Sequence, residues 1–313
     1  MTPSYLNPTG HPDPLLYAIP AFVLLLVAEV LWARRVHVEP ATDVPVDPQH
    51  GSIRGFSWRD SVASISMGLG SLVVTAITKA PEVALYLFAN AHSLFTIPPT
   101  WWSWLLLVVL DDLCYWVYHA TSHKSRFFWA SHVNHHSSEH YNLSTALRQS
   151  WTKQVITPWF WLPLAILGFP AWMIVMQQAF SLIYQYWIHT EMVRTIGPLE
   201  WLFNSPSHHR VHHASNQRYL DKNHAGTFMF WDRLFGTFEN EGEPVVYGLT
   251  KNIHGYNLVH IAFHEYADIL RDVRSARSLR EAWMYTFGPP GWAPADAFVT
   301  ASGETAHGGT GHT

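Results

Sequence analysis

The chain begins with a long apolar segment. From Leu15 to Ala33 the only charged residue is Glu29, and the pair Arg34 and Arg35 follows directly. A bilayer core is about 30 Å thick, which about 20 apolar residues cross as a helix. Residues 1–14 contain no Lys or Arg, whereas a secretory signal peptide begins with a positively charged region. The pattern therefore predicts an uncleaved first transmembrane helix.

Three more apolar segments follow before residue 120. Residues 61–78 carry no charge and are rich in Gly, Ser, Ala and Val. Small side chains let membrane helices approach closely, so this segment predicts a second span. Residues 80–99 are apolar but contain Pro81 and Glu82, which predicts a segment at the interface or partly re-entrant. Residues 101–118 begin with a tryptophan cluster typical of headgroup level and predict a third span.

Two apolar segments in the middle of the chain, residues 155–167 and 171–187, are separated by Gly168 and Pro170. This arrangement predicts a helical hairpin that either crosses the membrane or dips into it. The whole pattern predicts an all-α integral membrane protein with about four to five transmembrane or re-entrant helices. A soluble protein with very apolar core helices is the alternative.

The basic residues indicate an orientation. If the N-terminus lies outside, then residues 34–60, residues 119–154 and everything after residue 188 are cytoplasmic, and all 19 Lys and Arg residues except Lys79 fall there. Cytoplasmic loops carry such an excess of positive charge. Further along, four arginines at helical spacing predict the solvated or headgroup-facing edge of a helix: Arg271, Arg274, Arg277 and Arg280.

The composition narrows the function classes. Charged residues make up 13% of the chain, against about 25% in a soluble globular domain. A net charge of −4 and scattered Lys and Arg argue against a nucleic-acid partner. The single cysteine, Cys114, can form neither an internal disulfide nor a cysteine-based zinc site. Histidine is the residue in excess, with 21 copies.

Most of the histidines in the middle of the chain fall into spaced groups: His119 and His123, then His132, His135 and His136, then His209, His212 and His213. Residues three or four apart share one face of a helix. Neutral imidazole is the commonest metal ligand, so three rings on one helical stripe predict a grip on one ion. Two histidines at this spacing would be weak evidence by themselves, but three groups with related spacing indicate a metal centre.

These histidines exceed the needs of one ion, since zinc takes about four ligands, and so they predict two metals. His189, directly after the predicted hairpin, is a further candidate ligand. His208 is turned about 100° from His209 on a helix and is either one more ligand or a neighbour. His140 and His224 are weaker candidates, which we expect to support the ligands or the fold.

The groups lie beside the predicted cytoplasmic ends of the spans. The metals would therefore lie at the boundary between cytosol and membrane, where a lipid chain reaches them. Three carboxylates near the groups, Asp112, Glu139 and Glu191, are candidates to accept hydrogen bonds from the ligand rings. The alternative for each is an ordinary charge at a surface or helix end.

The histidine pattern resembles that of the sterol desaturase and fatty acid hydroxylase superfamily of integral-membrane di-iron enzymes. The stretches NHHSSEHYNLSTALRQS (134–150), WIHTE (187–191), NSPSHHRVHH (204–213) and DKNHAGTFMFWDRLFGTFE (221–239) look most like the branch with bacterial C-5 sterol desaturase-like proteins and alkylglycerol monooxygenase. The resemblance covers roughly residues 60–255.

The resemblance implies about four transmembrane helices under a cytosolic helical cap that holds the di-metal site. It implies two iron ions, O2, an external electron donor, either a protein or a reduced cofactor, and a lipid substrate. The ligands it implies are His119, His123, His132, His135, His136, His189, His209, His212 and His213, with His208 as a further candidate. The chain would then divide into an anchor helix and loop (1–60), a catalytic domain (61–255), a helical segment (256–300) and a disordered tail (301–313).

Two positions depart from the family pattern. Val193 stands where many members have a further histidine, so His208 or water would complete one shell. Lys124 stands where the alkylglycerol branch has an acidic residue, which favours hydroxylation or desaturation of a lipid over ether cleavage as the expected reaction. Ether-lipid monooxygenation is the alternative within the family, and a divalent-metal transporter or sensor is the alternative from another class. Spacing alone does not choose iron over zinc or copper, because imidazole suits all three.

Overall fold

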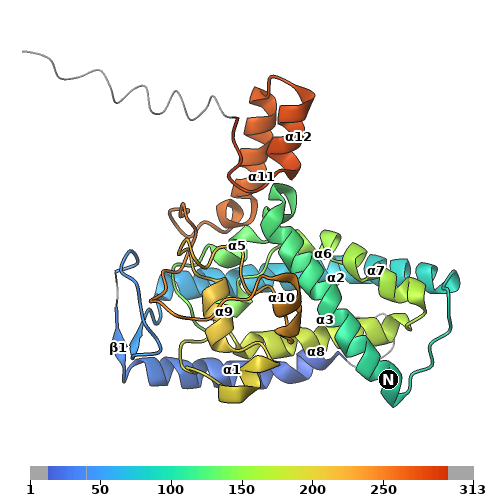
Figure 1. Ribbon diagram of the computed structural model, residues 1–313, viewed down its shortest axis with the longest axis horizontal. Coiled ribbons are helices and arrows are strands. Elements are labelled where there is room, and N and C mark those ends of the chain that lie inside the picture. The colour runs from blue at the N-terminus through green and yellow to red at the C-terminus, as the bar shows by residue number, and fades with distance from the viewer. Residues whose placement is uncertain (1–12, 40, 295–313) are drawn as a thin grey trace, which may run out of the picture.

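The computed structural model describes residues 13–39 and 41–294 and is built mainly of helices (Figure 1). Its elements are α1 (Pro14–Ala33), β1 (His37–Val38), β2 (Ser52–Ile53), α2 (Trp58–Ala91), α3 (Trp101–Lys124), α4 (Arg126–Trp129), α5 (Val133–His136), η2 (Thr145–Leu147), α6 (Lys153–Ile156), α7 (Pro158–Leu167), α8 (Ala171–Trp187), η3 (Gly197–Trp201), α9 (Pro206–His212), α10 (Phe230–Phe235), α11 (Leu258–Ser275) and α12 (Leu279–Phe287). The strands β1 and β2 form a short parallel pair. The predicted disordered tail, with His307 and His312, lies outside the described residues.

Among the described residues, α1 and α2 are long and apolar enough to cross a membrane. The prediction of a second span at residues 61–78 and a separate segment at residues 80–99 is wrong, because α2 is one helix of 34 residues that continues through Pro81. Lys79 and Glu82, one turn apart in its middle, form an ion pair at 3.1 Å. Pairing removes the net charge from this part of α2, which leaves the helix apolar.

The helices α7 and α8 form the expected hairpin, and the turn between them explains the glycine. Gly168 has a φ of +107°, and a Cβ added there would lie 2.0 Å from the carbonyl oxygen of Phe95. Only glycine fits this position. With 10 residues, α7 is about 15 Å long, half of a bilayer core. The predicted number of spans therefore stays a prediction.

A hydrophobic core joins α2, α3, α7 and α8. Its buried side chains include Tyr86 of α2, Leu107 of α3, Trp161 of α7 and Met173 of α8. The small residues predicted to allow close packing do so on α2, where a Cβ added to Gly68 would lie 2.7 Å from the carbonyl oxygen of Leu147. This close approach seats η2, and the loop before it, directly against α2.

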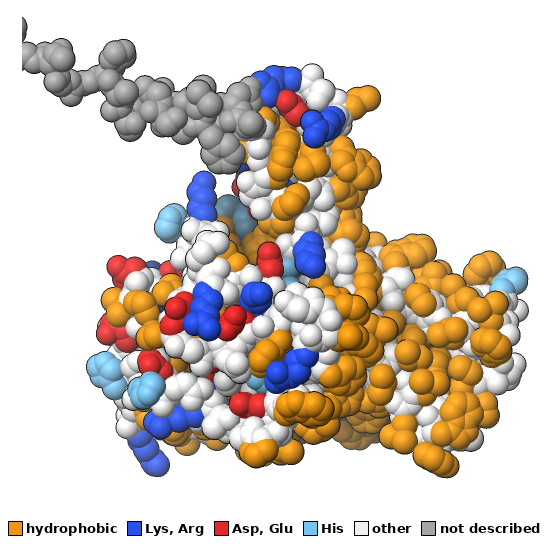
Figure 2. All heavy atoms as spheres, viewed as in Figure 1, with side chains coloured by type: hydrophobic (Ala, Val, Ile, Leu, Met, Phe, Trp, Pro, Cys, Tyr) orange, Lys and Arg blue, Asp and Glu red, His pale blue; other side chains and the backbone are white. Residues whose placement is uncertain are grey.

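The surface divides into two parts. Figure 2 shows apolar side chains gathered over the half of the molecule that contains α7 and the adjoining ends of α2 and α3. Charged side chains gather on the other half and at the free end of the hairpin formed by α11 and α12. Large exposed apolar patches mark membrane or protein contacts in soluble and membrane proteins alike.

Candidate metal centre

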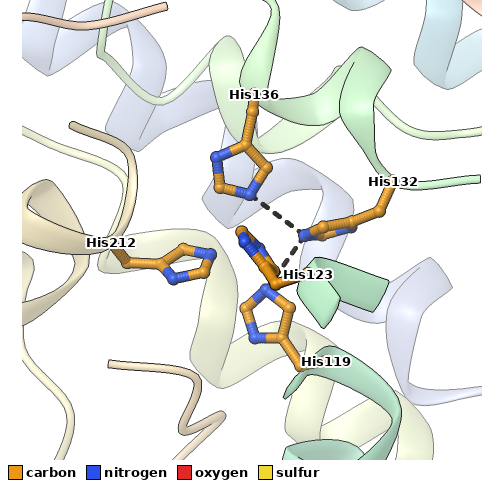
Figure 3. Close-up of side chains that lie close together, drawn as sticks. All are labelled: His119, His123, His132, His136 and His212. Atoms are coloured by element: carbon orange, nitrogen blue, oxygen red, sulfur yellow. Dashed lines mark hydrogen bonds between the residues drawn. The ribbon is translucent and has the colours of Figure 1, made fainter. Parts of the chain in front are cut away.

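Nine histidines come together in two groups in the described part of the chain. Within each group the potential ligand atoms lie within 4.8 Å of one another. The first group, whose rings converge in Figure 3, consists of His119, His123, His132, His136 and His212. The second group consists of His135, His189, His209 and His213. His135 is half-buried, and the other rings are buried.

The histidines of the two groups come from several helices. His119 and His123 lie one turn apart near the C-terminal end of α3 and therefore share a face. The helix α9 carries His209 and His212, and His213 follows directly at its C-terminal end. The helix begins at a strong start signal, because Pro206 is its first residue and the hydroxyl of Ser205 accepts a hydrogen bond from the backbone N–H of His208.

The expectation that each set of three histidines grips one ion is wrong. His132 and His136 lie in the first group, whereas His135, beside His136 on α5, lies in the second. The set on α9 divides in the same way, with His212 in the first group and His209 and His213 in the second. Successive residues of a helix are turned by about 100°, so one short helix can serve both groups. The two groups are therefore tied together by α5 and α9.

Hydrogen bonds at the outer ring nitrogens decide which nitrogen faces inward. Three rings donate from Nδ1 to a backbone carbonyl oxygen: His119 to His224 at 2.8 Å, His189 to Gln185 at 2.7 Å, and His212 to Lys222 at 2.9 Å. A carbonyl oxygen only accepts, so Nδ1 carries the hydrogen and the Nε2 atom of each neutral ring keeps a lone pair. Such an arrangement is the usual support of a metal-bound imidazole.

The inner nitrogens lack the partners that buried polar atoms need. The Nε2 atoms of His123, His212 and His213 are buried without a hydrogen-bond partner. The Nε2 atoms of His119 and His132 lie 2.9 Å apart. A contact this close needs either a hydrogen on one of the two nitrogens or a cation between two lone pairs. The geometry therefore fits a cation in each group.

Protons do not supply that charge at neutral pH. Burial lowers the pKa of His189 to about 4. It lowers the pKa of His132, His136, His212 and His213 well below the ordinary histidine value. The rings are therefore neutral, which is the form that binds metal, and imidazole donors suit iron, zinc and copper.

The loop of residues 221–224 holds the outer side of the first group. Besides the carbonyls of Lys222 and His224, it places a carboxylate oxygen of Asp221 3.5 Å from Nδ1 of His123. Asp221 and Asn223 both have a positive φ, of 57° and 56°. Asp and Asn tolerate this left-handed conformation better than other residues, apart from glycine. Sequence reasoning missed Asp221, although the stretch Asp-Lys-Asn carries this turn signal.

Buried carboxyl groups hold the segment around His189. Glu29 of α1 accepts hydrogen bonds from the backbone N–H of Leu143, at 2.7 Å, and from the hydroxyl of Thr190. Glu191 accepts the backbone N–H groups of Arg54 and Gly55. These bonds tie the residues after His189 to α1 and to the segment before α2.

Arg210, which lies between His209 and His212 on α9, also holds the segment after His189. Its guanidinium pairs with Glu241 through two hydrogen bonds of 2.7 Å and donates to the carbonyl oxygens of Thr190 and Val193. A fully buried arginine can satisfy this many acceptors because of its planar fork of donors.

The predicted carboxylate partners of the rings have other roles. Asp112 accepts the backbone N–H groups of Thr227 and Phe228, at 2.7 and 3.0 Å, and Glu191 accepts backbone groups as described. Glu139 lines a polar surface cavity of about 120 Å³. All three residues are near the histidines in the sequence, but Asp112 and Glu191 accept hydrogen bonds from backbone N–H groups and not from the ligand rings.

The remaining histidine candidates lie outside both groups. His208 is buried, and its ring packs edge-on against Phe238 at 5.4 Å between ring centroids. His140 lines the polar cavity with Glu139. His224 packs behind the first group, with its ring 5.1 Å from that of His123, and supports it through its carbonyl.

Comparison with known proteins agrees with this geometry. Residues 104–237 match the fatty acid hydroxylase family. The chain is 41% identical to human alkylglycerol monooxygenase, over 75% of this chain and 53% of the relative, and 37% identical to that of Danio rerio, over 88% and 59%. It is 24% identical to the ornithine lipid hydroxylase of Rhizobium tropici, over 58% of this chain and 54% of the relative.

The chain spans just over half the length of these curated relatives. No solved structure was found to match it. The matched region begins within α3 and ends just after α10, so it contains every histidine of both groups. The chain therefore belongs to the fatty acid hydroxylase family.

Proposed function

We propose that the chain is a membrane di-iron monooxygenase that uses O2 to oxidise an ether lipid of the alkylglycerol class. The observation that carries the proposal is the pair of histidine groups, in which buried ring nitrogens converge and the Nε2 atoms of His123, His212 and His213 have no hydrogen-bond partner. Membership of the fatty acid hydroxylase family supports iron among the metals that imidazole suits.

Each histidine has a definite part in holding the metals. His119, His123, His132, His136 and His212 would hold one iron, and His135, His189, His209 and His213 the other. When bound, the irons would supply the activation of O2, with electrons from an external donor. The protein fixes the ring orientations through the carbonyls behind them, and burial of the rings keeps bulk water away.

The comparisons favour the ether-lipid alternative over sterol desaturation. Alkylglycerol monooxygenases from four animals are 35–41% identical to the chain. Lys124, which differs from the acidic residue expected in the alkylglycerol branch, is exposed at the end of α3 and is not one of the candidate ligands. Hydroxylation of the carbon beside the ether oxygen would give a hemiacetal, which breaks into a fatty aldehyde and a glycerol.

We further propose that the chain is an integral membrane protein with its histidine groups on the cytoplasmic side. The apolar helices α1 and α2 and the apolar surface of Figure 2 support insertion, and the distribution of Lys and Arg supports the orientation. The substrate would then reach the metals from the bilayer. A metal transporter would need ionisable groups along its spans, whereas Lys79 and Glu82 in the apolar part of α2 are paired with each other.

The test combines metal analysis with a labelled reaction. The chain is produced in iron-replete cells and purified, its iron is counted, and membranes that contain it are given an alkylglycerol, a reductant and ¹⁸O2. We expect two irons per chain and ¹⁸O in the aldehyde, since one oxygen atom enters the C–H bond and the other leaves as water with two electrons from the reductant.

The variants His136→Ala and His264→Ala provide the comparison. His136→Ala should lose the product, whereas His264→Ala, which alters a ring outside both groups, should retain it. A protein without metal would contradict the di-iron proposal. An unsaturated or hydroxylated sterol or fatty acyl product in place of the aldehyde would contradict the choice of ether lipid and support the first interpretation.

A further inference from the structure

The helix α11 exposes an apolar stripe on one side. Val259, Phe263 and Leu270 are exposed, and Tyr266 between them is half-buried. Their spacing of four, three and four residues places them on one face of the helix. Ile261, on a different face, is buried against the body. The exposed stripe is therefore a second apolar face, in addition to the one that packs.

The helix α12 continues this apolar surface. Leu279, Trp283 and Phe287, each four residues apart, are 91%, 62% and 39% exposed. Their spacing places them on one side of α12. Figure 1 shows the hairpin of α11 and α12 projecting from the body, and Figure 2 shows apolar side chains along its side that faces the apolar half.

Ring contacts join the hairpin to the apolar half of the body. Phe287 lies 5.6 Å from Phe127, which lies 5.3 Å from Phe128, and Phe128 lies 5.8 Å from Phe160 of α7, between ring centroids. Beside Phe160, Trp159 is exposed on the surface of α7. A series of ring contacts thus connects the apolar side of α12 to the apolar surface of α7.

Basic side chains surround the free end of the hairpin. Arg271, Arg274, Arg277 and Arg280 are all exposed there. Arg271 pairs with Asp268 on α11, and Arg277, between the two helices, pairs with Glu281 of α12. Both arginines keep more than half of their side-chain surface exposed. Apolar side chains beside exposed arginines are typical of helices that lie in a membrane interface with anionic headgroups.

We propose that the hairpin of α11 and α12 lies along the surface of a bilayer that contains anionic lipid. Its apolar stripes enter the boundary between headgroups and acyl chains, and its arginines face the phosphates. The inference rests on the proposed membrane insertion of the body. In this position the hairpin extends the apolar surface of α7 sideways, in the plane of the membrane.

The hairpin is fixed to the metal centre, so its contact with lipid sets the height of that centre. Arg126, three residues after His123, donates to Glu265 at 2.6 Å and to Asp272 at 2.7 Å, both on α11. Its backbone N–H donates to the carbonyl oxygen of Gly288, just after α12. The side chain of Arg126 is buried, and its hydrogen bonds hold both helices against the end of α3.

The test measures where single labels lie in nanodiscs of phosphatidylcholine and phosphatidylglycerol. Cys114 is replaced by Ala in the full chain, and one cysteine is introduced at Leu279, at Leu72 of α2 or at Thr250 in a polar loop, all exposed positions. Each carries the same fluorophore, which is exposed to iodide in water and to quenchers at known depths in the lipid. These sites are on the surface, so the substitutions should not disturb folding.

We expect the label in Leu279→Cys to be quenched by lipid-borne groups at a depth of about 5–10 Å and to be shielded from iodide. The label in Thr250→Cys should behave in the opposite way, and the label in Leu72→Cys should lie deeper. Replacing Arg274, Arg277 and Arg280 together by Gln should move the label of Leu279→Cys toward water, and so should omission of phosphatidylglycerol.

The outcomes separate this inference from the membrane proposal on which it rests. Lipid quenching at position 72 with iodide quenching at position 279 would overturn the hairpin inference and leave the membrane proposal intact. Shielding of position 279 from both quenchers would overturn it in favour of a protein partner or a second copy. Iodide quenching at position 72 would contradict membrane insertion itself.

Discussion

The carboxylate of Asp221 lies 3.5 Å from Nδ1 of His123, although the two residues come from distant parts of the chain. His123 projects its other nitrogen, Nε2, into the first histidine group, where it has no hydrogen-bond partner. The contact with Nδ1 of His123 lowers the pKa of the Asp221 carboxyl, so this carboxylate is charged at neutral pH. A carboxylate behind a ligand ring fixes its orientation and makes its inner nitrogen a better donor.

Replacing Asp221 should therefore loosen one metal and not the other. We expect Asp221→Ala to release one of the two ions to a chelator about 10–100 times faster, because partners behind the ligands typically contribute that much affinity. The release is followed by absorbance of a chelator complex. Equal acceleration for both ions would contradict a specific role at the first group.

Two further variants separate the carboxylate from the backbone. Asp221→Gly relieves the positive φ of 57° and should release metal as fast as Asp221→Ala without a loss of thermal stability. Asp268→Asn, which alters a carboxylate on α11 paired only with Arg271, should leave release unchanged.

The division of α5 and α9 between the groups predicts selective losses. His212→Ala removes a donor from the first group and His135→Ala a donor from the second. Each should lower the metal content to about one ion per chain and abolish activity, because the reaction needs both ions. Elemental analysis of the purified variants measures this. His140→Ala and His264→Ala should keep both ions, and loss of metal in His264→Ala alone would show that the groups are wrongly assigned.

The buried pair of Arg210 and Glu241 should be important for stability. Arg210→Gln leaves the Glu241 carboxylate, whose side chain is 4% exposed, without its positively charged partner. Breaking a buried pair costs about 3–5 kcal/mol, so we expect a clearly lower unfolding temperature in detergent. The double variant Arg210→Gln with Glu241→Gln should recover part of the loss, since no charge remains buried alone. A double variant as unstable as the sum of both singles would argue against pairing as the cause.

The contact at Gly68 makes a prediction about packing. A methyl group in Gly68→Ala would lie 2.7 Å from the carbonyl oxygen of Leu147, so α2 and η2 must move apart. Overpacking of this kind costs about 1–3 kcal/mol, which a thermal unfolding scan detects. Gly242→Ala is the control, because an added Cβ there meets nothing closer than 3.6 Å and its stability should not change.

The apolar pattern alone placed several helices well. The segment from Leu15 to Ala33 coincides with α1, and the hairpin split at Gly168 and Pro170 coincides with α7 and α8. These elements follow from local properties, namely apolar length and the conformational limits of Gly and Pro. The predicted end of the second helix near residue 78 was wrong, because the sequence does not show that Glu82 is neutralised by Lys79 and that α2 tolerates Pro81.

The sequence by itself also determined which histidines to consider, because their spacing repeats along the chain. Only the tertiary structure decided how they divide, with neighbours His135 and His136 in different groups and His208 in neither. It likewise decided that Asp221, and not Asp112 or Glu191, lies behind a ring, while backbone amides occupy the other two carboxylates. The reason is physical: spacing along a helix gives the direction of a side chain relative to its own axis, whereas the partner of a buried donor depends on which distant segment packs against it.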